Sequence, residues 1–112
     1  MANSTITITF NRFPEIAAKL PRETSAVVRK TAYDVEAAAK MVVPVDTGAL
    51  KNSITTEMEG DLSAIVAPHT EYAVFVEYGT SRGSPAQPYM TPAAEANRGP
   101  FEQAMTQMLN RL

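Results

Sequence analysis

Hydrophobic and polar residues alternate strictly near the start of the chain, in the stretch TITITF from Thr5 to Phe10. Successive side chains of a strand point to opposite faces, so this period of two predicts a half-buried β-strand. The period then changes. From Arg22 to Val42, apolar residues recur at spacings of four and three, which predicts a long helix with one apolar stripe. The stripe consists of Val28, Ala32, Val35, Ala39 and Val42.

Prolines mark the boundaries of this helix. A shorter helix is expected before Pro21, with Asn11 as its cap and Pro14 in its first turn, where a missing N–H costs nothing. Pro44 prevents the long helix from continuing and favours an extended conformation for Val43.

Two strand-like segments, SITTEME and LSAIVAP, flank the dipeptide Gly60-Asp61. A two-residue loop of this kind predicts a β-hairpin in which Glu59 pairs with Leu62. In that register one face of the hairpin holds Ile54, Met58, Ile65 and Ala67.

The run YAVFVEY, from Tyr72 to Tyr78, is apolar on both sides and predicts a strand that is covered on both faces. An extended, proline-rich arm follows over residues 79–91. A last helix is then expected, with Thr91 as its cap, Pro92 at its first position and an interruption or kink at Gly99-Pro100. Its apolar stripe is Phe101, Ala104, Met105, Met108, Leu109 and Leu112.

These elements predict one domain over residues 1–112 of the α+β class. We expect the long helix and the C-terminal helix to pack on a small, mostly antiparallel β-sheet, with the proline-rich arm outside the core.

Composition narrows the functional classes. Ten basic and 12 acidic residues give a net charge of −2, and no cluster of Lys and Arg is present for stable nucleic-acid binding. Passage of DNA without binding remains compatible with this charge. The chain has no Cys and one His, His69, so neither a thiolate site nor a metal site is expected. Neither a signal peptide nor a membrane-spanning segment is expected.

The sequence VPVDTGA around Asp46 is typical of the catalytic loop of aspartic proteases. Those enzymes need two such carboxylates on strand-fed loops, whereas here a long helix ended by Pro44 precedes Asp46. A capping role is the alternative: the Asp46 carboxylate can accept backbone N–H bonds from Gly48 or Ala49. Val45 and Leu50 would then form a hydrophobic staple across the first turn of a helix.

Three stretches in this order, AKMVVPVDTGALKNSI, YAVFVEYGTS and PAQPYMTPA, resemble the tail-component family of long-tailed bacteriophages. Members of this family are head–tail joining, or tail-completion, proteins of the phage neck. The resemblance implies a structural subunit of a ring, usually six-fold, between the head connector and the top of the tail tube. It also implies a passage for DNA without specific binding, no catalytic residue and no cofactor. The expected location is the virion, after assembly in the host cytoplasm.

The resemblance carries over family positions as structural residues: Pro44, Asp46, Thr47, Gly48, Leu50, Ser53, Ile54, Tyr72, Glu77, Tyr78, Gly79 and Thr80. Within the arm it indicates a candidate interface formed by Arg82, Pro85, Pro88, Tyr89 and Met90. We expect residues 79–90 to become ordered on assembly and to contact an adjacent subunit or a partner ring; a mobile surface loop is the alternative. Two other functions stay open: a generic α+β interaction module, and a homodimeric aspartic protease that uses Asp46.

Overall fold

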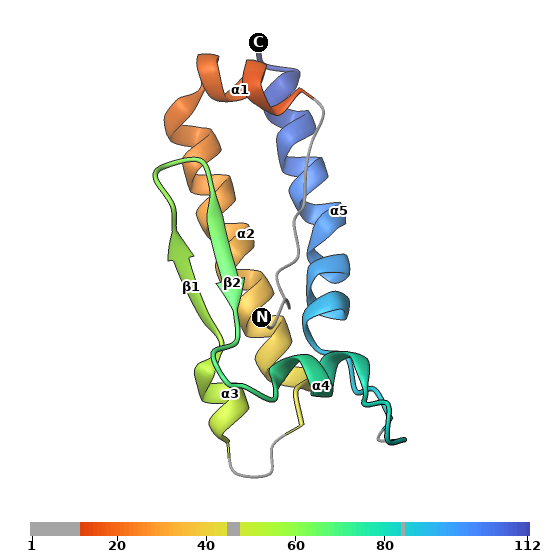
Figure 1. Ribbon diagram of the computed structural model, residues 1–112. Coiled ribbons are helices and arrows are strands. Elements are labelled where there is room, and N and C mark those ends of the chain that lie inside the picture. The colour runs from red at the N-terminus through yellow and green to blue at the C-terminus, as the bar shows by residue number, and fades with distance from the viewer. Residues whose placement is uncertain (1–11, 45–47, 84) are drawn as a thin grey trace.

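The computed structural model describes residues 12–44, 48–83 and 85–112, and Figure 1 shows their arrangement. The helices are α1 (Phe13–Lys19), α2 (Pro21–Val42), α3 (Ala49–Ser53), α4 (Ala73–Tyr78) and α5 (Met90–Leu109), and the strands are β1 (Thr55–Met58) and β2 (Ala64–Ala67). The long helices α2 and α5 run side by side in opposite directions, and the antiparallel β1–β2 hairpin lies against α2. The predicted α+β class is confirmed.

Helix α2 confirms the predicted long helix almost residue for residue, because it begins at Pro21 and ends at Val42. Ala32, Val35 and Ala39 of the predicted stripe are buried. Val42 is not, since 55% of it is exposed, and Val43 is buried instead. Val43 follows Ala39 by four residues, which keeps it closer than Val42 to the line of the stripe.

Helix α1 confirms the predicted short helix, with Pro14 in its first turn, while Asn11 lies outside the described residues. Ile16 of α1 is fully buried and contacts the C-terminal half of α5. Of the stripe predicted for α5, Phe101, Met105 and Met108 are buried. Leu112 is not, with 43% of its surface exposed.

Of the interruption or kink predicted at Gly99-Pro100, the interruption is wrong, because α5 continues through both residues, and the kink stays a prediction. Both residues lie on the exposed side of the helix. Ala93 and Ala94 before them and Phe101 after them are buried. Packing on both sides of the dipeptide therefore holds the helix together despite the missing N–H of Pro100.

The predicted hairpin is confirmed, but its predicted register is wrong by one residue. Met58 pairs with Ala64, and the N–H of Glu59 donates to the carbonyl of Ser63 at 2.7 Å. The loop therefore has three residues, 60–62, with Gly60 in the left-handed region at φ 75°. The shift exchanges the two faces of the second strand. Val66 packs against the core, in place of Ile65 and Ala67.

The strand predicted for Tyr72–Tyr78 is wrong, because these residues form helix α4. A short apolar run has no period that separates a buried strand from a helix. At helical spacing, Ala73 and Glu77 point inward, and the aromatic residues between and around them point outward. The strand predicted at Thr5–Phe10 lies outside the described residues.

The described part of the chain forms an elongated body of 52 × 24 × 21 Å. Its radius of gyration, 15.5 Å, exceeds the value of about 13 Å for a compact chain of this length. Two hydrophobic clusters follow one another along the body. The larger lies where α2 ends and α5 begins, and the smaller lies between α1 and the C-terminal half of α5. No helix in the described ranges has the length and apolar character needed to cross a membrane.

Candidate functional site

Glu77 connects helix α4 to the start of α5. Only 2% of this residue is exposed. Its Oε1 accepts hydrogen bonds from the backbone N–H groups of Tyr89 at 3.0 Å and Met90 at 2.8 Å, and its Oε2 accepts one from the N–H of Thr91 at 3.1 Å. These donors belong to the first turn of α5, which has no capping bond from the side chain of its own N-cap residue. Glu77 therefore caps α5 from a different helix.

The environment of Glu77 favours its ionised form. Burial of the carboxyl group opposes ionisation, but hydrogen bonds from the N–H groups of Met90 and Tyr89 and from the side chain and N–H of Thr91 outweigh that cost and hold its pKa below the ordinary value. A carboxylate at the N-terminus of a helix also interacts favourably with the helix dipole. The predictions of Thr91 as the cap and Pro92 as the first helical residue are wrong, because α5 begins at Met90 and both residues lie inside its first turn.

Tyr89 closes the same junction from the other side. It is fully buried, and its hydroxyl donates to the carbonyl of Ala73 at 3.1 Å. The N–H of Gln87 donates to the carbonyl of Val76 at 2.8 Å. The end of the arm that leads into α5 is thus fixed to α4. We define this set of contacts between α4 and the start of α5 as the α4–α5 junction.

The arm leaves α4 at Gly79, which adopts φ 79° and whose N–H donates to the carbonyl of Phe75 at 2.8 Å. A turn follows, in which the N–H of Gly83 donates to the carbonyl of the half-buried Thr80 at 3.2 Å. The candidate interface residues of the arm divide into two groups. Arg82, Pro85 and Pro88 are exposed, whereas Tyr89 and Met90 are buried and anchor the arm. A contact between the exposed group and a neighbouring subunit stays a prediction.

The first family motif builds the base of the larger cluster. Leu50 and Ile54 are buried in it, and Pro44 is half-buried beside it. Ser53 joins two segments, since its hydroxyl donates to the carbonyl of Leu50 at 2.7 Å and accepts from the N–H of His69 at 3.1 Å.

Gly48 occupies the N-cap position of α3 at φ 82°, a conformation that favours glycine. The cap predicted at Asp46 stays a prediction. Asp46 itself lies outside the described residues, as do Val45 and Thr47.

The outer surface of α4 carries a row of exposed aromatic residues. Tyr72, Phe75 and Tyr78 recur at every third position, and 43%, 54% and 57% of them are exposed. We call these three residues the α4 row. Tyr72 and Tyr78 were among the predicted family positions, but their common exposed face was missed because the segment was interpreted as a strand.

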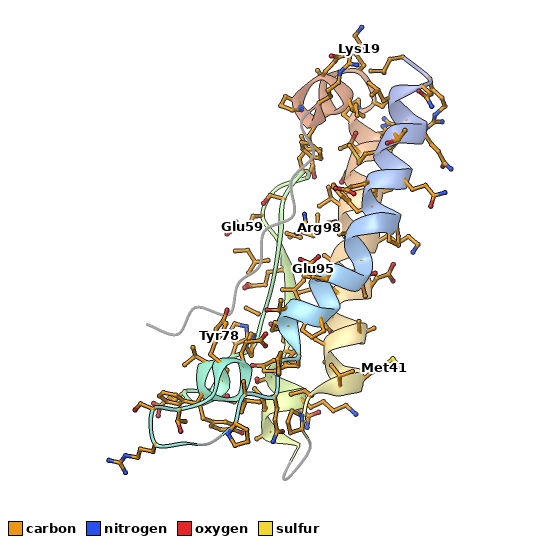
Figure 2. The ribbon with its side chains drawn as sticks, turned by 90° about the vertical axis from the view of Figure 1, so that its right-hand side faces the viewer. Lys19, Met41, Glu59, Tyr78, Glu95 and Arg98 are labelled. Atoms are coloured by element: carbon orange, nitrogen blue, oxygen red, sulfur yellow. The ribbon has the colours of Figure 1, made fainter. Side chains whose placement is uncertain are left out.

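A second apolar row lies on the outer surface of α2. Tyr33, Ala37 and Met41 follow one another at spacings of four, and all are exposed, Tyr33 to 50% and Met41 to 85%. We call these residues the α2 row. Met41 and Tyr78 lie on opposite sides of the same end of the molecule (Figure 2). The spacing of this row is visible in the sequence, but the stronger Ala and Val stripe of the buried face obscured it.

The polar side chains that could take part in chemistry are dispersed over the part of the chain that the structure describes. Within the described ranges, no three His, Asp or Glu side chains come close enough together to hold a metal ion. The exposed His69 has its Nε2 2.9 Å from the hydroxyl oxygen of Thr55. The features that stand out are a braced junction and two apolar rows, and apolar rows of this kind serve contact with other surfaces.

The chain matches one family model, HK97-gp10-like, described as "Bacteriophage HK97-gp10, putative tail-component", over residues 10–79. The matched segment includes α1 to α4, both strands and Glu77. Comparison with curated proteins gave no match. Comparison with solved structures gave none either.

Proposed function

The chain belongs to the HK97-gp10-like family of bacteriophage tail components, and on that premise we propose that it is a structural subunit of the phage neck. In this role, copies of the chain form a ring, six-fold in the assembled particle, that completes the tail and joins it to the head connector. The protein then acts by assembly and not by catalysis. The observation that carries this proposal is the family match over 70 of the 112 residues, 10 through 79.

Two properties of the chain support a ring subunit. The α4–α5 junction ties the arm to the body by bonds from Glu77 and Tyr89, so the same end of every copy has a fixed shape. The α4 row and the α2 row leave that end with large apolar side chains exposed on two sides. An isolated monomer gains nothing from such exposure, whereas a subunit in an assembly can bury it.

The charge of the chain suits a passage for DNA. A net charge of −2 with no basic cluster gives no site where successive phosphates would be neutralised. DNA would therefore pass through the ring without being retained. Partners at the two faces of the ring would be the head connector on one side and proteins of the tail tube or its terminator on the other.

The test uses a phage whose copy of this gene carries a stop codon. In a host that does not suppress the stop codon, we expect DNA-filled heads and finished tails that remain separate, and infectious particles on supply of the protein from a plasmid. Electron microscopy of the rescued particles should locate the protein at the head–tail junction. Normal joined particles in the absence of the protein would overturn the proposal.

The same rescue separates assembly from proteolysis. Asp46→Asn removes the carboxylate that a protease needs but keeps a side chain that caps helices equally well. We expect the Asp46→Asn protein to restore infectivity fully. Loss of infectivity by a variant that folds and enters particles would favour the protease.

A further inference from the structure

We propose that the α4 row of one subunit packs against the α2 row of a second copy, in a head-to-tail contact that closes the ring. This inference rests on the proposed function and names the surfaces through which neighbouring subunits meet. Each row is therefore covered by the other row of a second, identical chain.

The two rows have the dimensions of matching helix surfaces. From Tyr72 to Tyr78 the α4 row covers six helical steps, about 9 Å, and from Tyr33 to Met41 the α2 row covers eight, about 12 Å. The α4 row consists of aromatic side chains, while the α2 row has the small Ala37 at its centre and the flexible Met41 at its end. Aromatic side chains placed over a small residue and a methionine give close packing and favourable sulfur–aromatic contacts.

The positions of the rows favour a head-to-tail contact. Met41 and Tyr78 lie at the same end of the long axis but on opposite sides of it, as Figure 2 shows. A contact between two different patches on opposite sides of a subunit repeats from copy to copy and generates a ring when the rotation closes. A contact between two copies of one patch would instead stop at a dimer.

Charges flanking the rows select the same pairing. Exposed Glu71 directly precedes the α4 row, and exposed Arg29 and Lys30 precede Tyr33 by about one turn. Within the described residues neither Glu71 nor Arg29 forms an ion pair, and Lys30 is paired only with Asp34, through an exposed bond of 2.6 Å. With the two helices parallel and Phe75 level with Ala37, Glu71 comes level with Tyr33, about one turn from this basic pair of the neighbouring subunit and within reach of its long side chains. Complementary charges at the rim of an apolar contact fix its register.

The test uses disulfide trapping. Because the chain has no Cys of its own, every disulfide must come from an introduced cysteine. The chain is given Ala37→Cys and Phe75→Cys together, because these residues are the centres of the two rows, and each change is also made alone. All three proteins are oxidised free in solution at high concentration and inside purified phage particles. The proposal predicts that the double variant forms a ladder of covalent oligomers that ends at the ring, while a mixture of the two single variants forms dimers.

Three outcomes would overturn the proposal. Dimers of Phe75→Cys alone would indicate that the α4 row pairs with itself, with Glu71 of each copy facing Arg82 of the other. A lack of cross-links in particles that contain the protein would remove both rows from the interface. Particles that assemble without the protein would overturn the neck function but not the proposed contact. The contact is then decided by the double variant free in solution, and the absence of a ladder of covalent oligomers would overturn it.

A charge-reversal experiment checks the register independently. We expect Glu71→Lys to lower the cross-linking yield of the double-cysteine chain about fivefold, since it replaces an attractive rim pair by a repulsive one. Arg29→Glu should have the same effect, and the two reversals together should restore the yield. Lys19→Glu is the matched control, because Lys19 lies at the far end of the molecule (Figure 2). An equal loss with Lys19→Glu, or no recovery in the combined variant, would overturn the pairing of Glu71 with Arg29.

Discussion

Glu77 is a buried carboxylate that is stabilised by backbone donors and not by a cation. It accepts bonds from three successive N–H groups, those of Tyr89, Met90 and Thr91. The first N–H groups of any helix lack partners within the helix, and here they would be buried without this side chain. The same hydrogen bonds therefore offset two costs: that of burying the Glu77 carboxylate and that of burying the N–H groups at the start of α5.

Replacing Glu77 by Gln should lower the free energy of unfolding by about 2 kcal/mol. The Gln carbonyl oxygen can keep two of the bonds, but its NH₂ group then faces an N–H donor. The measurement is urea unfolding at pH 7 followed by circular dichroism. Glu57→Gln, at an exposed position of the hairpin, is the matched control and should change stability by less than about 0.5 kcal/mol. A Glu77→Gln protein as stable as the control would mean that the cap contributes nothing.

The depressed pKa of Glu77 also gives stability a dependence on pH. Its pKa in the folded protein lies below the unfolded value of about 4.3, so the unfolded chain takes up the proton first as the pH falls. The stabilisation is complete above the unfolded pKa and is lost as the pH falls through the folded pKa. Stability measured from pH 7 to pH 2 should therefore fall less steeply in Glu77→Gln. Glu36, whose pKa is lowered by its bonds to Lys40 and Thr56, keeps its own share in both proteins.

The hydroxyl of Tyr89 should contribute separately to the α4–α5 junction. Tyr89→Phe removes the hydroxyl that makes the 3.1 Å bond to the carbonyl of Ala73 and leaves that acceptor buried. We expect a loss of about 1–2 kcal/mol, measured by the same urea titration. Tyr33→Phe on the exposed α2 row provides the control. If the two changes cost the same, the buried bond is not a stabilising part of the junction.

Secondary structure could be predicted from the sequence wherever the apolar period extended over several turns. Helix α2 shows this clearly, because its stripe identified Ala32, Val35 and Ala39 as buried residues. Helix α4 shows the limit, since six residues of mostly apolar character fit a strand and a helix equally well. The residue that caps α5 could not be predicted from the sequence, for a different reason. Glu77 lies 12 residues before Tyr89, and the sequence gives no sign of which carboxylate returns to the start of the helix.

At the level of elements, α5 is the helix whose sequence is least favourable for a helix. Gly99 and Pro100 together cost about 4 kcal/mol relative to two alanines in a helix interior, yet α5 is continuous. The burial of Phe101 and Ala94 on either side supplies the opposing free energy. Tertiary packing thus decides the structure of this element against its local preference.

Substitutions in this dipeptide should stabilise the protein. Gly99 has no heavy atom within 4 Å of the position of an added Cβ, so Gly99→Ala should add about 1 kcal/mol. Pro100→Ala restores a helical N–H and should add about 1–2 kcal/mol, after allowance for the freer unfolded chain. Melting temperatures by calorimetry provide the measurement. Gly60→Ala is the contrasting control, because its φ of 75° makes the change destabilising. A lower melting temperature for Pro100→Ala would mean that α5 needs the proline for its shape.

At the level of the whole molecule, the 52 Å body has two hydrophobic clusters that share only the helices α2 and α5. Helix α1 contributes to the smaller cluster through Ile16, and α3 contributes to the larger one through Leu50. The rows proposed as interfaces lie at the end with the larger cluster. The two ends can therefore differ in local stability, and the end that meets its neighbours is the better braced one.

Hydrogen exchange should reveal this division. Met105→Ala leaves a cavity in the smaller cluster and should cost about 3 kcal/mol. We expect the amides of α1 and the last turns of α5 to lose protection, while those around Leu50 and Ala73 keep most of theirs. Leu50→Ala is the matched variant in the larger cluster and should reverse the pattern. Equal loss at both ends in both variants would make the body a single cooperative unit. In that case a change anywhere along its length would weaken the assembling end, and the Met105→Ala protein would also rescue phage joining poorly.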